Sequence, residues 1–177
     1  MSSKIRFATI TINTASFQDP SADLATPIAQ STLEATGAFE LAAPPSYLPE
    51  DSPDKFDAQL KAKLLELGDK GDVDLVFTIG CTGFGPRERS PEVVKSLITR
   101  DAPGLVHLML TASFQKTPYA AVSRPAAGIY KDRVLMITLP GGSKAVRENI
   151  EALVGSEVLQ RCVRYMEGGR HVKDVQK

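Results

Sequence analysis

The sequence predicts a single α/β domain with a mostly parallel sheet. Short apolar runs rich in β-branched residues alternate along the chain with segments whose apolar residues recur at helical spacing. Strands that alternate with helices form βαβ units, whose right-handed crossovers make neighbouring strands parallel. The length of 177 residues and the apolar share of 42% fit one globular domain with a continuous core.

Four segments have the composition of strands that are buried on both faces of a sheet. The clearest is 73–79, VDLVFTI, in which most residues are β-branched or large and apolar. The others are expected at 4–12, 39–43 and 133–139. Residues 44–49 contain three prolines and are therefore expected to form a rigid, non-helical connector.

Four helices are expected, and each begins at a hydroxyl side chain that can serve as its N-cap. In three of them proline follows, at the first helical position, where its missing N–H costs little. The expected starting points are Thr26-Pro27, Ser52-Pro53, Ser90-Pro91 and Ser143. Gly37 is expected to end the first helix, and Gly68 with Gly71 the second. Residues 1–165 thus form the predicted domain, and 166–177 a flexible C-terminal tail.

Composition argues against several classes of function. Lysine plus arginine and aspartate plus glutamate both number 21, so bulk charge does not indicate a nucleic-acid partner. No apolar run reaches the ~18 residues of a membrane span, and no signal peptide is visible before the first strand. Cys81 and Cys162 lie far apart, without the spacing of metal ligands. These observations favour a cytoplasmic protein without nucleic-acid or membrane partners.

Candidate site residues follow three of the predicted strands. Asn13 and Thr14 come directly after the first strand, residues 80–88 after the third, and residues 140–144 after the fourth. In open α/β sheets, ligands bind beyond the carboxyl ends of the strands. Because these strands should lie in one sheet, we expect the three loops to face one crevice.

The second and third of these loops have the composition of anion-binding sites. Glycines let a ligand approach backbone N–H groups, and a helix N-terminus adds partial positive charge. The residues concerned are Gly80, Gly83 and Gly85 in one loop, and Gly141, Gly142, Ser143 and Lys144 in the other. Two such loops indicate a substrate with more than one phosphate. Glu88 would then hold a magnesium ion against the phosphate oxygens.

Other interpretations of the same residues stay open. Glycine and proline are common in any loop between a strand and a helix, and neither loop matches a nucleotide-binding fingerprint. Arg87 and Glu88 could be a solvated ion pair, and residues 13–16 could form only a turn. Cys81 is better explained as a packed small side chain than as a nucleophile, since no histidine lies near it in sequence. His107, within an apolar run, is better explained as a core or interface residue.

The segment 78–92, TIGCTGFGPRERSPE, resembles the signature of the molybdenum-cofactor biosynthesis family, which reads roughly TTGGTGFxPRDxTPE. That family includes the bacterial Mog and MoaB proteins, the gephyrin G domain and its plant counterpart. Similar order and spacing recur downstream, at Ala102-Pro103-Gly104, Thr117-Pro118, residues 123–128 and residues 139–146. The resemblance is good from about residue 73 to about residue 153 and weaker before that.

The resemblance implies a three-layer α/β/α fold of the MoaB/Mog type and a homotrimer. It also implies a molybdopterin adenylyltransferase, which transfers AMP from ATP to the terminal phosphate of molybdopterin, with magnesium as cofactor and pyrophosphate as product. By position, Glu88 is a catalytic carboxylate, and the second is Glu50, or Asp51 after a one-residue shift; Glu88 and Glu50 would be the metal ligands. The implied substrate-binding residues are Asn13, Thr14, Gly80, Cys81, Thr82, Gly83, Ser123, Arg124, Pro140, Gly141, Gly142, Ser143 and Lys144.

The chain departs from the family pattern at several of these positions. Cys81 replaces a glycine, which adds a Cβ where a close backbone approach is expected. Glu88 and Glu50 replace aspartates, and the extra methylene in Glu88 could displace a magnesium ligand by about 1.5 Å. Thr14 lacks the carboxylate of the family. Two alternatives follow: a paralogue that binds molybdopterin without transferring AMP, and a scaffold that acts through oligomerisation.

Overall fold

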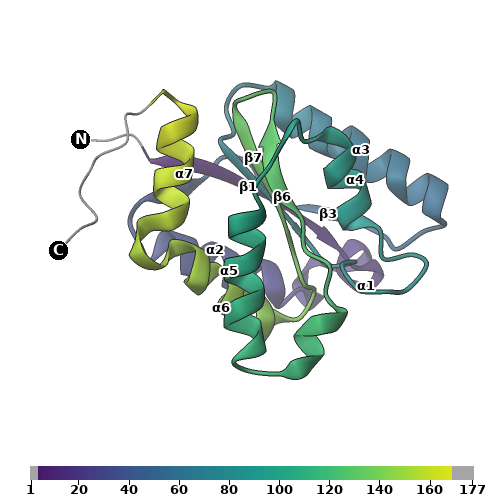
Figure 1. Cartoon of the computed structure of the whole chain (residues 1–177). Coiled ribbons are helices and arrows are strands. Elements are labelled where there is room, and N and C mark those ends of the chain that lie inside the picture. Colours follow the sequence, from purple (N-terminus) through teal and green to yellow (C-terminus); the bar gives the residue numbers. More distant parts are fainter. Residues whose placement is uncertain (1–3, 169–177) are drawn as a thin grey trace.

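The computed structural model describes residues 4–168, which form a three-layer α/β/α fold (Figure 1). The strands are β1 (Ile5–Ile12), β2 (Phe39–Leu41), β3 (Ser46–Leu48), β4 (Leu75–Ile79), β5 (Arg100–Asp101), β6 (Ala127–Tyr130) and β7 (Val134–Leu139). The helices are α1 (Thr14–Gln18), α2 (Ala25–Glu34), α3 (Pro53–Asp69), α4 (Ser90–Leu97), α5 (Pro103–Phe114), α6 (Ser143–Val154) and α7 (Val158–Met166). Short 3₁₀ turns lie at η1 (Pro20–Ala22), η2 (Pro118–Val122) and η3 (Gly155–Glu157).

The strands form one sheet in the order β2-β1-β4-β7-β6-β5, and β3 pairs with β1 as well. β1, β4 and β7 lie parallel in the middle of the sheet, whereas β6 runs antiparallel to both β7 and β5. The predicted mostly parallel sheet is confirmed. Since β1, β4 and β7 are neighbours, the segments that follow them meet at one edge of the sheet.

Residues 44–49 differ from the expected connector, because they contain the strand β3. β2 pairs with residues 5–7 of β1, and β3 pairs with residues 10–12 along the same side of that strand. Pro44 and Pro45 precede β3 and Pro49 follows it, so no proline has to donate a ladder hydrogen bond from inside the strand. The prolines therefore bound a short strand rather than preventing one.

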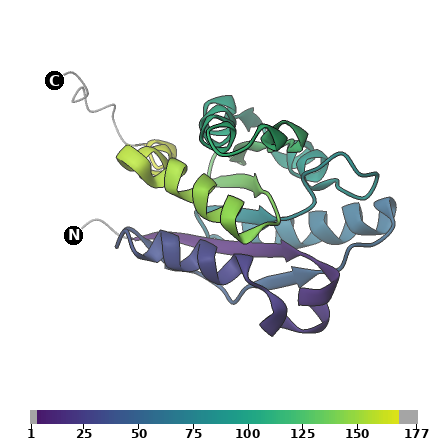
Figure 2. The same ribbon diagram turned by 90° about the horizontal axis from the view of Figure 1, so that it is seen from below.

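Helices cover both faces of the sheet, with α3 and α4 on one side and α2, α5, α6 and α7 on the other (Figure 1). Successive strand residues point to opposite faces. Phe7, Phe77 and Ile137 pack against the second group of helices, whereas Ala8 and Val76 pack against α3 and α4. Seen from below, α2 and α6 lie side by side (Figure 2). Burial on both faces explains why the strands appear in the sequence as continuous apolar runs.

The helix starts correct the sequence prediction, because none of the four predicted hydroxyl side chains caps its helix. α2 begins two residues before Pro27, because Oδ1 of Asp23 accepts hydrogen bonds from the N–H groups of Ala25 (2.8 Å) and Thr26 (3.1 Å). Thr26 is buried and its hydroxyl bonds to that of Thr11. In α6 the N-cap is Gly142, and no side chain caps the helix.

The second helix and the domain both extend past their predicted ends. Gly68 lies inside α3 rather than ending it, and a Cβ there would be 2.9 Å from the ring of Tyr130. α7 continues to Met166, and residues 169–177 of the predicted tail lie outside the described residues. Within residues 4–168, no helix is both long enough and apolar enough to cross a bilayer.

Candidate functional site

The loops after β1, β4 and β7 meet around Gly80. The N–H of Gly80 donates to the carbonyl of Leu139 at the end of β7 (2.9 Å). A Cβ on Gly141 would lie 3.4 Å from Cα of Gly80, and a Cβ on Gly80 would lie 2.6 Å from the carbonyl oxygen of Ile12. Gly80 also has φ +104°, a conformation that favours glycine. Glycine therefore lets the two glycine-rich loops and the end of β1 share one rim of the sheet.

Two cavities open at this rim, one on each side of Gly141. The first, here called the main cavity, has a volume of about 320 Å³. Thr82, Gly83 and Glu88 of the β4 loop line it together with Ser123 and Pro140. Its remaining walls come mostly from α5, η2 and α6, and include Leu110, Ser113, Tyr119, Val122, Glu148 and Asn149.

The second, here called the polar cavity, has a volume of about 230 Å³. It is lined by Asn13, Ser16 and Asp23 on one side and by Gly141 and Ser143 on the other. The start of α6 faces this cavity, so its free N–H groups add positive potential there. The structure thus brings a mostly apolar and a polar hollow together at the carboxyl ends of parallel strands.

The carboxylate of Glu88 lies back over its own loop. Its Oε2 accepts a hydrogen bond from the N–H of Gly85 (2.8 Å), and the N–H of Glu88 donates to the carbonyl of Gly85 (3.0 Å). A Cβ on Gly83 would be 2.7 Å from Oε1 of Glu88, and one on Gly85 would be 2.9 Å from Oε2. The two glycines therefore make the space that the longer glutamate side chain fills.

Cys81 lies next to both predicted catalytic glutamates but does not line either cavity. Burial, and then the negative charges of Glu50 and Glu88, raise the pKa of the Cys81 thiol to about 12. The side chain packs into the core between the sheet and α3 and α4. At neutral pH the thiol is protonated and inert, which agrees with a packed side chain and not with a nucleophile.

Of the two acidic candidates after β3, only Asp51 has side-chain partners within residues 4–168, and neither lines the main or the polar cavity. The backbone N–H of Glu50 donates to the Thr14 hydroxyl (3.1 Å), which holds residue 50 beside the β1 loop. Asp51 instead pairs with Lys55 (2.6 Å) and accepts a hydrogen bond from the N–H of Ser52 (2.8 Å). Asp51 thus serves the first turn of α3, whose start it precedes.

The residues present fit a magnesium ion that is shared with a phosphate substrate. Magnesium is usually held by one or two protein carboxylates, with water and substrate phosphates as its other ligands. Glu88 lines the main cavity and can supply one carboxylate, whereas Glu50 lines neither cavity. Across residues 4–168, no three histidine, cysteine, aspartate or glutamate side chains lie close enough together to hold a metal ion.

Asn13 both lines the polar cavity and has a structural partner, whereas other residues singled out from the sequence lie away from the cavities. The carboxamide oxygen of Asn13 accepts from the N–H of Ser16 (2.9 Å) and caps α1. Lys144 is exposed on the first turn of α6 and lines neither cavity. His107 is exposed on α5, not buried in the core. Arg124 contacts the β4 loop, as described below.

Sequence reasoning missed some residues of the site. Asp23 and Asn149 line the cavities, and both are buried. Asn149 donates to the carbonyl of Ala145 (2.7 Å) and to the hydroxyl of Ser113 (3.2 Å). A carboxylate just before a helix was a usable signal for Asp23 as a cap. No local sequence pattern identifies Asn149, because only the packing of α6 against α5 makes it part of the wall of the main cavity.

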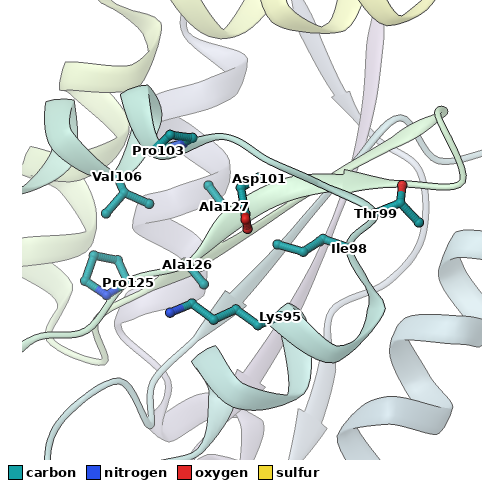
Figure 3. Close-up of a pocket in the computed structure, with 9 residues that line it drawn as sticks. All are labelled: Lys95, Ile98, Thr99, Asp101, Pro103, Val106, Pro125, Ala126 and Ala127. Carbon is teal, nitrogen blue, oxygen red and sulfur yellow. The ribbon is translucent and has the colours of Figure 1, made fainter.

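A third hollow, of about 510 Å³, lies away from the predicted site residues, between α4, β5 and α5 (Figure 3). The close-up shows mostly apolar walls, with Lys95 and Asp101 as its charged side chains. Pro125 is shared with the main cavity, but none of the predicted catalytic or substrate-binding residues lines this hollow.

A doubly covered parallel sheet with paired cavities and glycine-rich loops at its carboxyl edge defines a ligand-binding protein of the α/β class. A family model described as "Probable molybdopterin binding domain" matches residues 8–161. The chain belongs to this family, within the Mog/MoaB group of molybdenum cofactor biosynthesis proteins.

Named relatives agree with this assignment. Gephyrin of Dictyostelium discoideum is 50% identical over 76 residues (43% of this chain and 10% of that protein). The molybdenum cofactor synthesis protein cinnamon of Drosophila melanogaster is 30% identical over 149 residues (84% and 24%). A molybdopterin adenylyltransferase of Helicobacter pylori J99 is 37% identical over 94 residues, 53% of each chain. The matches thus span from a tenth to about half of the length of these relatives.

The solved structures support the fold. The molybdopterin biosynthesis enzyme MoaB of Thermus thermophilus has 33% sequence identity and a TM-score of 0.80, covering 93% of this chain and 97% of that one. The Mog protein of Mycobacterium ulcerans has 26% identity and a TM-score of 0.76, covering 94% and 99%. The three-layer α/β/α fold of the MoaB/Mog type is confirmed.

Proposed function

We propose that the protein is a molybdopterin adenylyltransferase. The reaction joins the terminal phosphate of molybdopterin to the α-phosphorus of ATP and breaks the bond to the β-phosphate, releasing pyrophosphate. The observation that carries the proposal is that the loops 80–88 and 140–144 meet in the wall of the main cavity, where Glu88 lies, while Gly141 and Ser143 also line the adjoining polar cavity. The name of the Helicobacter pylori relative favours the same activity.

The two cavities suit the two substrates. The main cavity has apolar walls, including Leu110 and Val122, that suit the flat pterin. The polar cavity lies beside the N-terminus of α6, which suits the phosphates of the nucleotide. Gly141 lines both, so a phosphate bound there would lie between the two substrates.

Catalysis would then rest on positioning and charge, because phosphoryl-type transfer needs little covalent help from the protein. The nucleophile is the phosphate oxygen of molybdopterin, and Cys81, protonated at neutral pH, takes no part. Magnesium, when bound by Glu88 and Glu50, supplies neutralisation of the phosphate charges. Backbone N–H groups of residues 82–84 and at the start of α6 would donate to the phosphate oxygens.

Replacing Glu88 by glutamine tests the proposal. The variant keeps the size of the side chain and its acceptor oxygen for Gly85 but loses the charge that would hold magnesium. We expect pyrophosphate release from ATP, magnesium and molybdopterin to fall by about 100-fold or more, while molybdopterin binding stays within about threefold. Glu151→Gln, an exposed change on α6, is the control.

The outcomes separate the two functions considered for this fold. Unchanged turnover in Glu88→Gln would remove Glu88 from the mechanism. A wild-type protein that binds molybdopterin but releases no pyrophosphate would be a binding paralogue instead of a transferase. The proposal includes a homotrimer, which rests on the family resemblance. It also includes a cytoplasmic location, which rests on the cysteine content.

A further inference from the structure

One side chain closes the loop that carries Glu88. Nε of Arg124 donates to the carbonyl of Gly83 (2.8 Å), and Nη2 donates to the carbonyl of Glu88 (2.6 Å). Those two carbonyls stand at the beginning and the end of the segment 83–88. The backbone N–H of Arg124 also donates to the carbonyl of Thr82 (2.8 Å). A single planar guanidinium therefore sets the distance between the ends of the loop.

The guanidinium is held in place from its other side. Glu92 on α4 forms an ion pair with Arg124, and the ring of Phe84 lies 5.7 Å from the guanidinium carbon. Burial opposes ionisation of Glu92, but the hydrogen bonds and charge of Arg124 outweigh it and hold the pKa of Glu92 below its usual value. Glu92 is thus charged at neutral pH and fixes the orientation of Arg124.

These contacts engage all three guanidinium nitrogens of Arg124 with the protein itself. It does not line the main cavity, although the neighbouring Ser123 does. Its Nε and Nη2 are engaged by loop carbonyls, and its Nη1 is engaged by Glu92. The resemblance implied a substrate-binding arginine, whereas its contacts are those of a residue that shapes the loop.

We propose that Arg124 is a positioning residue, which holds residues 83–88 closed so that the Glu88 carboxylate stays at the edge of the main cavity. The effect on turnover rests on the proposed function, but the effect on the loop does not. When catalysis depends on geometry, a displacement of about 1 Å can cost about 100-fold in rate. Apart from the two hydrogen bonds between Glu88 and Gly85, the loop has few other constraints, since Gly83 and Gly85 are permissive and Phe84 and Pro86 are exposed.

The proposal predicts that shape matters at this position and charge alone does not. Lysine carries the same charge as arginine, but on a compact ammonium group. It lacks the planar guanidinium that reaches two carbonyls at once. Arg124→Lys should therefore behave like Arg124→Met. If Arg124 instead attracted an anionic substrate, lysine would retain much of the effect.

The experiment compares these two variants with Arg89→Met. Arg89 adjoins the same loop, pairs with Asp57 (2.6 Å) and has a similar side-chain exposure, 36% against 33% for Arg124, but donates to no loop carbonyl. We measure amide hydrogen exchange of residues 83–88, and the kcat and KM of pyrophosphate release. For both Arg124 variants we expect exchange in 83–88 to rise about tenfold, kcat to fall about 100-fold, and KM for ATP to change less than about threefold. Arg89→Met should leave all three near wild type.

Each outcome decides the proposal. Exchange in residues 83–88 that stays at the wild-type rate in both Arg124 variants overturns it, whatever happens to turnover. Full activity in Arg124→Lys also overturns it. If the wild type releases no pyrophosphate, the proposed function fails, and the exchange rates still decide the role of Arg124. If Arg124→Met does not fold, Glu92→Gln takes its place, with exchange expected between the wild-type and Arg124→Lys rates.

Discussion

At the scale of single residues, Cys81 shows why the related signature has glycine at this position. Cys81 has φ +54°, in the left-handed region, directly after Gly80 with φ +104°. Two consecutive residues with positive φ turn the chain away from β4, and the turn is held by Ser90. The Ser90 hydroxyl donates to the carbonyl of Gly80 (2.8 Å), and its N–H donates to that of Cys81 (3.1 Å). The added Cβ points into the core, so the expected obstruction of a ligand does not arise from it.

Substitutions at Cys81 should separate backbone strain from packing. Cys81→Gly removes a left-handed penalty of about 1 kcal/mol or more but also a buried side chain of similar worth, so the free energy of unfolding should change by less than about 1 kcal/mol. Cys81→Val puts a β-branched side chain in the same conformation and should destabilise by about 2 kcal/mol or more. Urea titrations of the three proteins measure both. A valine variant as stable as the glycine variant would contradict the strain argument.

At the scale of elements, the sequence predicted the helices and strands whose local composition agrees with the way they pack. β1, β4 and β7 are buried on both faces, and their continuous apolar composition made them visible. Ser52-Pro53 and Ser90-Pro91 marked the starts of α3 and α4 to within one residue. α5 was missed because its apolar residues surround the whole helix, and β5 because two exposed residues carry no pattern.

Some features of the candidate site could likewise be predicted from the sequence, and others could not. That the loops after β1, β4 and β7 would meet followed from parallel strands and glycine composition. The role of Arg124 did not, since its partners Gly83, Glu88 and Glu92 lie between 32 and 41 residues away in sequence. Contacts of this kind depend on how β6 is placed against the β4 loop, and no local pattern records that.

Gly128 in β6 provides a test at this scale. A Cβ there would lie 2.7 Å from the carbonyl oxygen of Arg100 in β5 and close to Ile98. Gly128→Ala should therefore push the edge strand away and destabilise the protein by about 1–3 kcal/mol. Gly104 in α5 is the matched control, because nothing lies within 4 Å of its missing Cβ. Gly104→Ala should stabilise by about 0.5–1 kcal/mol. Equal unfolding midpoints for the two variants would contradict the contact at β5.

At the scale of the whole molecule, some of the ion pairs join separate elements. Arg6 in β1 donates to Asp74 just before β4 through its backbone N–H (2.8 Å), Nε (3.1 Å) and Nη2 (2.7 Å). Arg89 joins α4 to α3 through Asp57 in the same manner. Such pairs connect neighbouring strands and helices, and they make the stability depend on the ionisation of their carboxylates.

Asp74 determines part of the stability at acid pH. Burial opposes its ionisation, but the hydrogen bonds and charge of Arg6 outweigh burial and hold the pKa of Asp74 below the usual 3.8. A carboxylate with a lowered pKa contributes stability that is present above the usual value and lost as the pH falls through the lowered one. Urea midpoints of the wild type should thus be nearly constant from about pH 7 to 5 and fall toward pH 3.

Asp74→Asn should test this assignment against Asp72→Asn, an exposed change two residues earlier. Asparagine keeps the shape and part of the hydrogen bonding but cannot titrate, so the Asp74 variant should begin with a lower urea midpoint at pH 7 and lose less of it on acidification. The Asp72 variant should run parallel to the wild type, because exposed charges contribute little to stability. If the curve of Asp74→Asn ran parallel to the wild type as well, the acid transition would have to arise from other carboxylates, such as Glu92, whose pKa is lowered by Arg124.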